Sequence, residues 1–244
     1  QVGVDYAFDI AERFGLTTLV KKGDSNDLNL AALGMGGLTK GVSTLEMASA
    51  YSVFVNDGKL KSSTCYTKVT NKAGDMILEP QTTESDVLDA GVAWIMRNVL
   101  QTVVSEGIGS YARVSGANVG GKTGTANKPN AGGYSDTTYS SVIAMAPMDD
   151  PQVCVLLIVD NPKGVHYASV TAGPGVKQIL SDTLRYLNVS PDEETETKTA
   201  AEKVKVPDVT GSSVEDAIGI LSGQGLSYDM DKSAESEDFV VAKQ

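Results

Sequence analysis

The stretch that decides the fold is Gly116-Ala-Asn-Val-Gly-Gly-Lys-Thr-Gly-Thr-Ala126, near the middle of the 244-residue chain. Two signatures overlap within it. The residues from Gly116 to Thr123 fit the phosphate-binding pattern G-x-x-x-x-G-K-[ST] letter for letter, whereas Lys122-Thr-Gly124 fits a shorter signature, K-T-G. Each signature requires a different structure around it, so the neighbouring residues decide between them.

The phosphate-binding interpretation fails on its context. It needs a buried strand before the loop and a helix directly after Lys122-Thr123, whose first backbone amides would hold phosphate. The ten residues 124–133 contain three glycines and a proline, which disfavour a helix. Residues 111–115 are a poor buried strand. We therefore predict that residues 118–125 form a strand with the K-T-G signature on it.

The K-T-G interpretation has a chemical rationale on a strand edge. A lysine ammonium and a threonine hydroxyl, Lys122 and Thr123, can hold a substrate carboxylate. The backbone N–H just after the glycine, that of Thr125, can stabilise a tetrahedral oxyanion. Gly124 has no Cβ, so a substrate backbone can approach. Three letters alone are weak evidence, and a surface strand that carries a lysine is the simpler alternative.

Outward from the motif, apolar spacing predicts a mixture of helices and strands up to residue 188. Helices are expected over 2–14, 44–55, 85–105 and about 170–187. In the third helix we expect Trp94 in the core and an apolar stripe formed by Leu88, Val92, Ile95, Val99 and Val103. Strands are expected over 118–122, 139–146 and 153–159, the last two joined by a turn at 147–151. Helices followed by antiparallel strands and a helix predict an α+β fold.

Three stretches around the motif resemble the penicillin-binding protein transpeptidases: Leu33–Gly58, Val104–Ala112 and Val155–Gly164. The order and spacing match over about residues 1–188. The resemblance implies the sandwich that this family shares with serine β-lactamases, in which helices flank a central antiparallel sheet. It also implies that Lys122, Thr123, Gly124 and Thr125 form the substrate site, with the Thr125 N–H in the oxyanion hole.

The activity implied by this resemblance is that of a peptidoglycan D,D-transpeptidase. In the family, a serine attacks the D-Ala–D-Ala end of a stem peptide, releases D-alanine and passes the acyl group to an amine on a neighbouring stem. The implied partners are peptidoglycan stem peptides, β-lactam antibiotics and possible cell-wall or division proteins, with no metal or cofactor. The implied location is the outer face of the cytoplasmic membrane, in a Gram-positive bacterium.

Two motifs of the family are missing from the sequence. No serine is followed by lysine three residues later, and no asparagine follows a serine by two residues. Ser-x-x-Lys supplies the nucleophile and its base in the family. We therefore expect a C-terminal fragment that penicillin does not acylate on its own. Two alternatives remain open: a non-catalytic module that binds peptidoglycan or a partner, and a hydrolase related to serine β-lactamases.

The charge of the chain is uneven and points to a further boundary. The net charge is −11, and most of the acidic excess lies after residue 188. Such a tail would repel nucleic acid and anionic membrane surfaces, which are therefore poor partners. We divide the chain into a partial transpeptidase domain (1–188), an acidic linker (189–203) and residues 204–244, which resemble a PASTA module cut short. A helix is expected there from Ser212 or Ser213 to about Gln224.

Residues outside the motif receive simpler interpretations. His166 is the only histidine and lies in a polar loop, so a surface or hydrogen-bonded role is expected. Cys154 alternates into an apolar strand and is expected to be buried, whereas Cys65 is expected to be exposed. Asn127 and Lys128 follow the motif and are candidates for lining the cleft.

Overall fold

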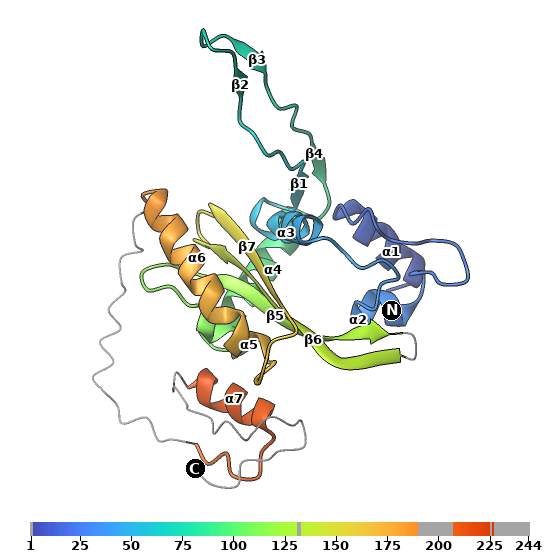
Figure 1. Cartoon of the computed structure of the whole chain (residues 1–244), viewed down its shortest axis with the longest axis vertical. Helices are drawn as coiled ribbons and strands as arrows, with labels where there is room; N and C mark the ends of the chain where they lie inside the picture. Colours follow the sequence, from blue (N-terminus) through green and yellow to red (C-terminus); the bar gives the residue numbers. More distant parts are fainter. Residues whose placement is uncertain (1, 131–132, 190–206, 225, 227–244) are drawn as a thin grey trace. The chain divides into compact units, whose positions relative to one another are not determined.

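The computed structural model describes residues 2–130, 133–189, 207–224 and 226. Figure 1 labels the helices and strands along the chain. The chain divides into two compact units, Gln1–Met96 and Arg97–Gln244. The first unit contains α1 (Val4–Arg13), α2 (Leu30–Met35), α3 (Thr44–Ser52), a 3-10 turn (Val53–Val55), β1 (Lys59–Lys61), β2 (Val69–Thr70), β3 (Met76–Leu78), β4 (Glu84–Asp86) and the first part of α4 (Ala90–Ser105).

A capping box begins α3. The Ser43 hydroxyl accepts a hydrogen bond from the Glu46 N–H at 3.2 Å, and the Glu46 carboxylate accepts one from the Ser43 N–H at 3.0 Å. The same carboxylate accepts from the N–H and hydroxyl of Thr17, at 2.9 and 2.6 Å. Glu46 therefore both starts the helix and ties the segment after α1 to it.

A buried carboxylate organises the long connection between α1 and α3. Asp27 is fully buried and accepts hydrogen bonds from the Val20 N–H at 2.7 Å and the Thr39 N–H at 2.6 Å. The Thr39 hydroxyl donates to it as well, at 2.7 Å. Burial by itself raises the pKa of the Asp27 carboxyl, but these donors outweigh it and hold the pKa below its ordinary value.

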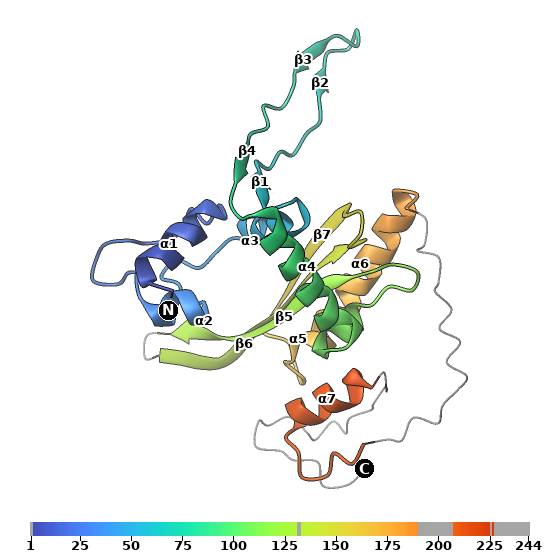
Figure 2. The same cartoon turned by 180° about the vertical axis from the view of Figure 1, so that it is seen from behind.

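A long hairpin follows α3. β1 pairs antiparallel with β4, and β2 pairs antiparallel with β3 at the far end of the same hairpin, as Figures 1 and 2 show. The Lys59 ammonium lies 3.1 Å from the Glu84 carboxylate across the first pair. This pairing corrects the helix predicted over 85–105. Because Glu84–Asp86 is a strand, α4 begins only at Ala90, after the Asp89 carboxylate accepts the Gly91 N–H at 2.8 Å.

The buried face of α4 also differs from the prediction. Ala93, Leu100 and Val104 are buried, whereas three members of the predicted stripe are about half exposed: Val92, Ile95 and Val99. Trp94 is 60% exposed, so its predicted place in the core is wrong. The prediction of a helix was therefore correct, but the predicted stripe is not the side of α4 that is buried in the described part of the chain.

The second unit is built on one antiparallel sheet in the order β5-β6-β7. Its elements are the end of α4, a 3-10 helix (Ile108–Ala112), β5 (Gly120–Asn130), β6 (Gly133–Ala146), β7 (Val153–Asp160), α5 (Ala168–Thr171), α6 (Gly173–Tyr186) and α7 (Val214–Gly223). The three predicted strands are all present, and the predicted last helix is split into α5 and α6. The α+β fold expected from the sequence is confirmed.

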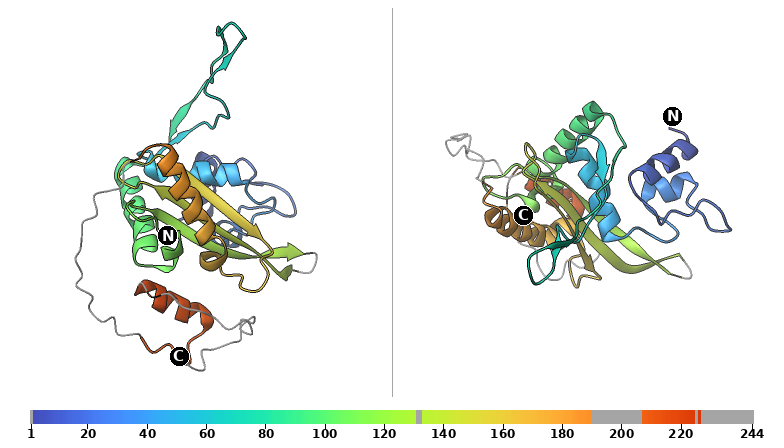
Figure 3. Two further views of the ribbon diagram at one scale, coloured as in Figure 1. Left: turned by 60° about the vertical axis from the view of Figure 1, so that its left-hand side comes forward. Right: turned by 90° about the horizontal axis from the view of Figure 1, so that it is seen from above.

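The core of this unit lies between the sheet and α6, which crosses one face of β6 and β7 (Figure 1, Figure 3). Val176, Leu180 and Leu184 recur every four residues along α6 and are buried against the sheet. Burying one such leucine contributes about 2 kcal/mol. On the other face (Figure 2), β5 comes close to α4, because a Cβ on Gly120 would lie 3.2 Å from the Gln101 backbone nitrogen.

Part of the PASTA-like segment falls within the described residues. α7 begins after Ser213, whose hydroxyl accepts the Asp216 N–H at 3.1 Å, and this agrees with the helix expected there. The predicted linker and most of the PASTA-like segment after Gln224 lie outside the described residues, apart from Val189 and Leu226. The PASTA assignment therefore remains a prediction.

Candidate active site

The four residues expected from the sequence lie in a row on β5. Their cross-strand partners on β6 are Ile143 for Lys122, Val142 for Thr123, Ser141 for Gly124 and Ser140 for Thr125. β5 is at the end of the strand order, and β6 is its only partner among the described residues. One edge of the K-T-G strand is therefore left unpaired by the part of the chain that the structure describes.

The alternation of a strand decides which backbone groups face this open edge. The Lys122 ammonium donates to the Thr123 carbonyl oxygen at 2.5 Å, so this oxygen faces away from β6. Backbone groups two residues apart on a strand point to the same side. The Thr125 N–H therefore faces the open edge too, which is the position that an oxyanion donor requires.

The side chains of the motif lie on two faces of the sheet. Lys122 and Thr125 are exposed, whereas Thr123 is only 8% exposed and lies on the face that α6 covers. A strand places neighbouring side chains on opposite faces, so Lys122 and Thr123 diverge at their Cβ atoms. In the structure as it stands, the exposed polar groups of the motif are the Lys122 ammonium and the Thr125 hydroxyl.

Gly124 lies close to the side chain of its partner on the next strand. The Ser141 hydroxyl donates to the Gly124 carbonyl oxygen at 3.1 Å. A Cβ on Gly124 would lie 2.9 Å from that same hydroxyl oxygen. The sequence suggested that glycine makes room for a substrate backbone; in the structure it also makes room for the side chain of the next strand.

The loop between β7 and α5 is bonded to both strands beside the motif. The hydroxyl of fully buried Ser140 donates to the His166 carbonyl oxygen, and the Thr125 hydroxyl oxygen accepts the Ala168 N–H at 3.2 Å. The His166 ring packs on the Tyr167 ring, with centroids 4.8 Å apart. Sequence reasoning missed Ser140 and Ala168. Strand alternation offered one signal, because Ser140 is a polar residue expected on an inward face.

Lys128 has a structural role at the end of the sheet. Its ammonium pairs with the Asp160 carboxylate and lies 4.5 Å from the centroid of the Tyr139 ring. Tyr139 and Asp160 are cross-strand partners on β6 and β7, so Lys128 ties all three strands together. A cation over an aromatic ring contributes about 0.5–2 kcal/mol. Asn127 is exposed beside it.

The structure also rejects the phosphate-binding interpretation. Lys122 and Thr123 lie inside β5, where no helix N-terminus follows them. Gly116 instead occupies a turn, with a φ of 71°, in which the Ala117 N–H donates to the Val114 carbonyl oxygen at 3.3 Å. The helix that would hold phosphate is replaced by a strand.

Among the described residues, no three His, Cys, Asp or Glu side chains come together in a way that could hold a metal ion. None of the helices described is long and apolar enough to cross a membrane.

An antiparallel sheet covered by a helix on one face, with K-T-G on its open edge strand, defines the fold class shared by transpeptidases and serine β-lactamases. The model of the penicillin binding protein transpeptidase domain matches residues 1–181. The chain belongs to this family.

Curated relatives agree with this assignment. The chain is 36% identical over 168 residues to the probable peptidoglycan D,D-transpeptidase PbpC of Pseudomonas aeruginosa, which covers 67% of this chain and 28% of the relative. It is 35% identical over 197 residues to the stage V sporulation protein D of Bacillus subtilis, which covers 74% of this chain and 29% of the relative. The chain thus spans less than a third of the length of these relatives.

Solved structures agree as well. The transpeptidase domain of penicillin-binding protein 3 from Burkholderia pseudomallei, in its apo form, matches with a TM-score of 0.61 and 29% identity, over 78% of this chain and 59% of that chain. Penicillin-binding protein 3 from Mycobacterium tuberculosis, complexed with ampicillin, matches with a TM-score of 0.64 and 23% identity, over 79% of this chain and 48% of that chain. The second likeness concerns the fold alone.

Proposed function

We propose that this chain supplies the K-T-G side of the acyl-transfer site of a peptidoglycan D,D-transpeptidase. In that reaction a serine hydroxyl attacks the carbonyl carbon of the penultimate D-alanine, the peptide bond to the last D-alanine breaks, and free D-alanine leaves. An amine of a neighbouring stem then takes the acyl group and restores the serine. Lys122 holds the terminal carboxylate, with the hydroxyl of exposed Thr125 beside it in place of that of Thr123, which is buried under α6, and the Thr125 N–H donates to the oxyanion.

The observation that carries this proposal is the position of Lys122–Thr125 on the unpaired edge of β5 in a member of this family. An extended peptide can lie along such an edge and form main-chain hydrogen bonds with it. A carboxylate at its end would draw the Lys122 ammonium away from the Thr123 carbonyl oxygen, because a charge-assisted hydrogen bond is stronger than one to a neutral acceptor.

The finer part of the proposal concerns this chain by itself. Its 244 residues contain no Ser-x-x-Lys and no Ser-x-Asn, so neither the nucleophile nor its base is present. These groups act as a unit in covalent catalysis. We therefore infer that penicillin does not acylate this chain alone. The same absence favours a second candidate, a non-catalytic module that binds peptidoglycan or a cell-wall or division partner, with residues 204–244 as the PASTA-like part.

The remaining proposals are the ligands and the location. Peptidoglycan stem peptides and β-lactams are the ligands that the site would take, since both carry a carboxylate beside a reactive carbonyl. The outer face of the cytoplasmic membrane is the compartment where this substrate is exposed. Relatives in Pseudomonas and Bacillus fit either type of cell envelope, so a Gram-positive source stays a prediction.

Intact-mass measurement with excess fluorescent penicillin tests this proposal. One sample is the 244-residue chain; the other carries, ahead of Gln1, a segment from a relative that supplies Ser-x-x-Lys and Ser-x-Asn. We expect only the longer sample to gain one penicillin mass. A full penicillin adduct on the 244-residue chain would overturn only the inference that this chain is not acylated by itself. No adduct on a folded longer sample would favour the non-catalytic module.

A further inference from the structure

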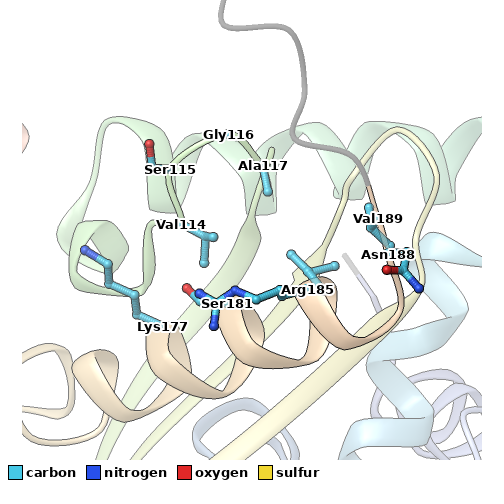
Figure 4. Close-up of a pocket in the computed structure, with 10 residues that line it drawn as sticks. Val114, Ser115, Gly116, Ala117, Lys177, Ser181, Arg185, Asn188 and Val189 are labelled. Carbon is cyan, nitrogen blue, oxygen red and sulfur yellow. The ribbon is translucent and has the colours of Figure 1, made fainter.

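A second site candidate lies on the second unit, between the turn at Val114–Ala117 and one side of α6 (Figure 4). It is a cavity of about 540 Å³, a size typical of ligand sites. None of the K-T-G residues belongs to it. Its lining residues are Val114, Ser115, Gly116, Ala117, Lys177, Ser181, Leu184, Arg185, Asn188 and Val189.

The floor of this pocket is apolar and fixed in place. Leu184 is buried in the same core as the sheet, and Val114, Ala117 and Val189 pack against that core. The turn that carries Ser115 to the rim is held by the hydrogen bond from the Ala117 N–H to the Val114 carbonyl oxygen and by the positive φ of Gly116. The pocket is therefore built partly on the buried core and not only on exposed side chains.

The rim carries positive charge and hydroxyl groups. Lys177, Ser181 and Arg185 are spaced by four residues on α6, so they share one side of the helix. Figure 4 shows Lys177 at one end of this row, with the Arg185 side chain extended toward Ser181. Eight residues of helix place the two cationic positions about 12 Å apart.

The charge of the pocket is not neutralised by its own lining. None of the ten residues around it is acidic. Arg185 pairs with Asp182 at 3.2 Å, but these side chains are 78% and 53% exposed. Such an exposed pair contributes only about 0–1 kcal/mol, so Arg185 can exchange it for another anion. Among the described residues, Lys177 takes part in no ion pair within 4 Å, in a chain whose net charge is −11.

We propose that this pocket binds an extended acidic peptide segment of the pattern acid-x-apolar-x-acid. In an extended strand, side chains two residues apart point to the same side, and residues four apart are about 13 Å apart. The two acidic side chains would therefore reach Lys177 and Arg185, while the apolar one between them enters the floor beside Leu184. The Ser115 and Ser181 hydroxyls supply further donors to the carboxylates. This site is independent of the acyl-transfer proposal.

Isothermal titration and amide NMR of the full 244-residue chain test this site with acetyl-Glu-Ser-Leu-Ser-Glu-amide as the probe. We expect binding with shift changes confined to residues 114–117 and 177–189. Lys177→Gln and Arg185→Gln should each weaken binding at least about tenfold. Lys72→Gln is the matched control, since Lys72 is an exposed lysine on the hairpin of the first unit. The probe with Gln in place of both Glu residues should not bind.

Three results would overturn the proposal. The first is no binding by the wild-type chain. The second is equal affinity of the Lys177→Gln, Arg185→Gln and Lys72→Gln variants, which would place the peptide elsewhere. The third is inorganic phosphate producing the same shifts and displacing the peptide at equal concentration, which would define a simple anion site. Lys177 and Arg185 are both exposed, so the variants should fold, and their thermal unfolding checks this.

Discussion

The hydroxyl oxygen of Thr125 accepts a hydrogen bond from the backbone N–H of Ala168 at 3.2 Å, although 43 residues separate the two. Thr125 follows the K-T-G motif on β5, and Ala168 is the first residue of α5. One side chain thus connects the strand that would bind substrate to the loop that returns from β7. Because this hydroxyl accepts from Ala168, its own proton remains available to a ligand carboxylate.

Replacing Thr125 with valine should destabilise the second unit. Valine has nearly the same shape but cannot accept the Ala168 N–H, which is buried at a residue only 2% exposed. An unsatisfied buried donor costs about 1–3 kcal/mol. Urea unfolding measures this loss, and amide exchange of Ala168 should accelerate. Thr125→Ser keeps the hydroxyl and serves as the control; equal stability of the Ser and Val variants would contradict the role of this bond.

Replacing Gly124 with alanine should also destabilise the sheet, through a steric conflict. The added Cβ would lie 2.9 Å from the Ser141 hydroxyl oxygen. Overpacking of this kind costs about 1–3 kcal/mol. Ser141→Ala removes the obstacle, so the double variant should recover part of the loss. A double-mutant cycle on the free energy of unfolding measures this coupling. Purely additive effects would show that the two side chains do not conflict.

Glu46 should make the first unit sensitive to acid. Hydrogen bonds from the Thr17 hydroxyl, and then from the Ser43 amide and hydroxyl, lower the pKa of Glu46 to about 2, from an ordinary value of 4.5. Because the folded pKa is the lower one, the stabilisation is complete above the unfolded pKa and is lost as the pH falls toward 2. We expect Glu46→Gln to be less stable than wild type at pH 7.

That difference in stability should shrink as the pH is lowered through the window between the two pKa values. Urea unfolding at several pH values between about 7 and 2.5 measures it. Glu79→Gln changes an exposed glutamate on the hairpin and is the control. A Glu46→Gln deficit that is the same at every pH would mean that the carboxylate charge is not the source of the stabilisation.

The two cysteines should differ sharply in reactivity. Cys154, expected to be buried, is partly buried, and this burial raises the pKa of its thiol to about 12, whereas Cys65 is exposed as expected. Since the thiolate is the reactive form, a thiol reagent at pH 8 should modify Cys65 quickly and Cys154 only after unfolding. Titration with Ellman's reagent should count one thiol in the native protein and two in denaturant. The folded Cys65→Ser variant should not react with the reagent. A rapid reaction of that variant would show that Cys154 is accessible.

Lys122→Ala should reduce penicillin acylation without loss of stability. The acylation rate is measured on the longer sample, which carries Ser-x-x-Lys and Ser-x-Asn ahead of Gln1. The Lys122 side chain is exposed and donates only to the neighbouring Thr123 carbonyl oxygen among the bonds described, so folding should not depend on it. Loss of one hydrogen bond to a charged group, about 1.5–3 kcal/mol, corresponds to roughly a 10- to 100-fold lower rate. Lys72→Ala is the control, and equal rates for the two variants would remove Lys122 from the site.

Much of the fold was predictable because local signals carried it. The run of apolar residues in Val153–Val159 predicted β7, and the helical spacing of Val176, Leu180 and Leu184 agrees with the helix predicted over about 170–187. Glycines and a proline after Lys122-Thr123 excluded a helix there, so the K-T-G motif was placed correctly on a strand. These inferences needed only neighbours in the chain.

Other features depended on residues distant in the sequence, and tertiary structure alone decided them. α4 starts at Ala90 and not at residue 85 because Glu84–Asp86 pairs with β1 about 25 residues earlier, at Lys59–Lys61. Periodicity predicted one apolar stripe for α4 and Trp94 in the core, and the prediction for Trp94 was wrong because packing buries Ala93, Leu100 and Val104 instead. The hydrogen bond between Thr125 and Ala168 forms only when two distant segments meet. The same is true of the pocket in which Lys177 and Arg185 lie near the turn at Gly116. Local pattern therefore determined the elements and the motif, and long-range packing determined what surrounds them.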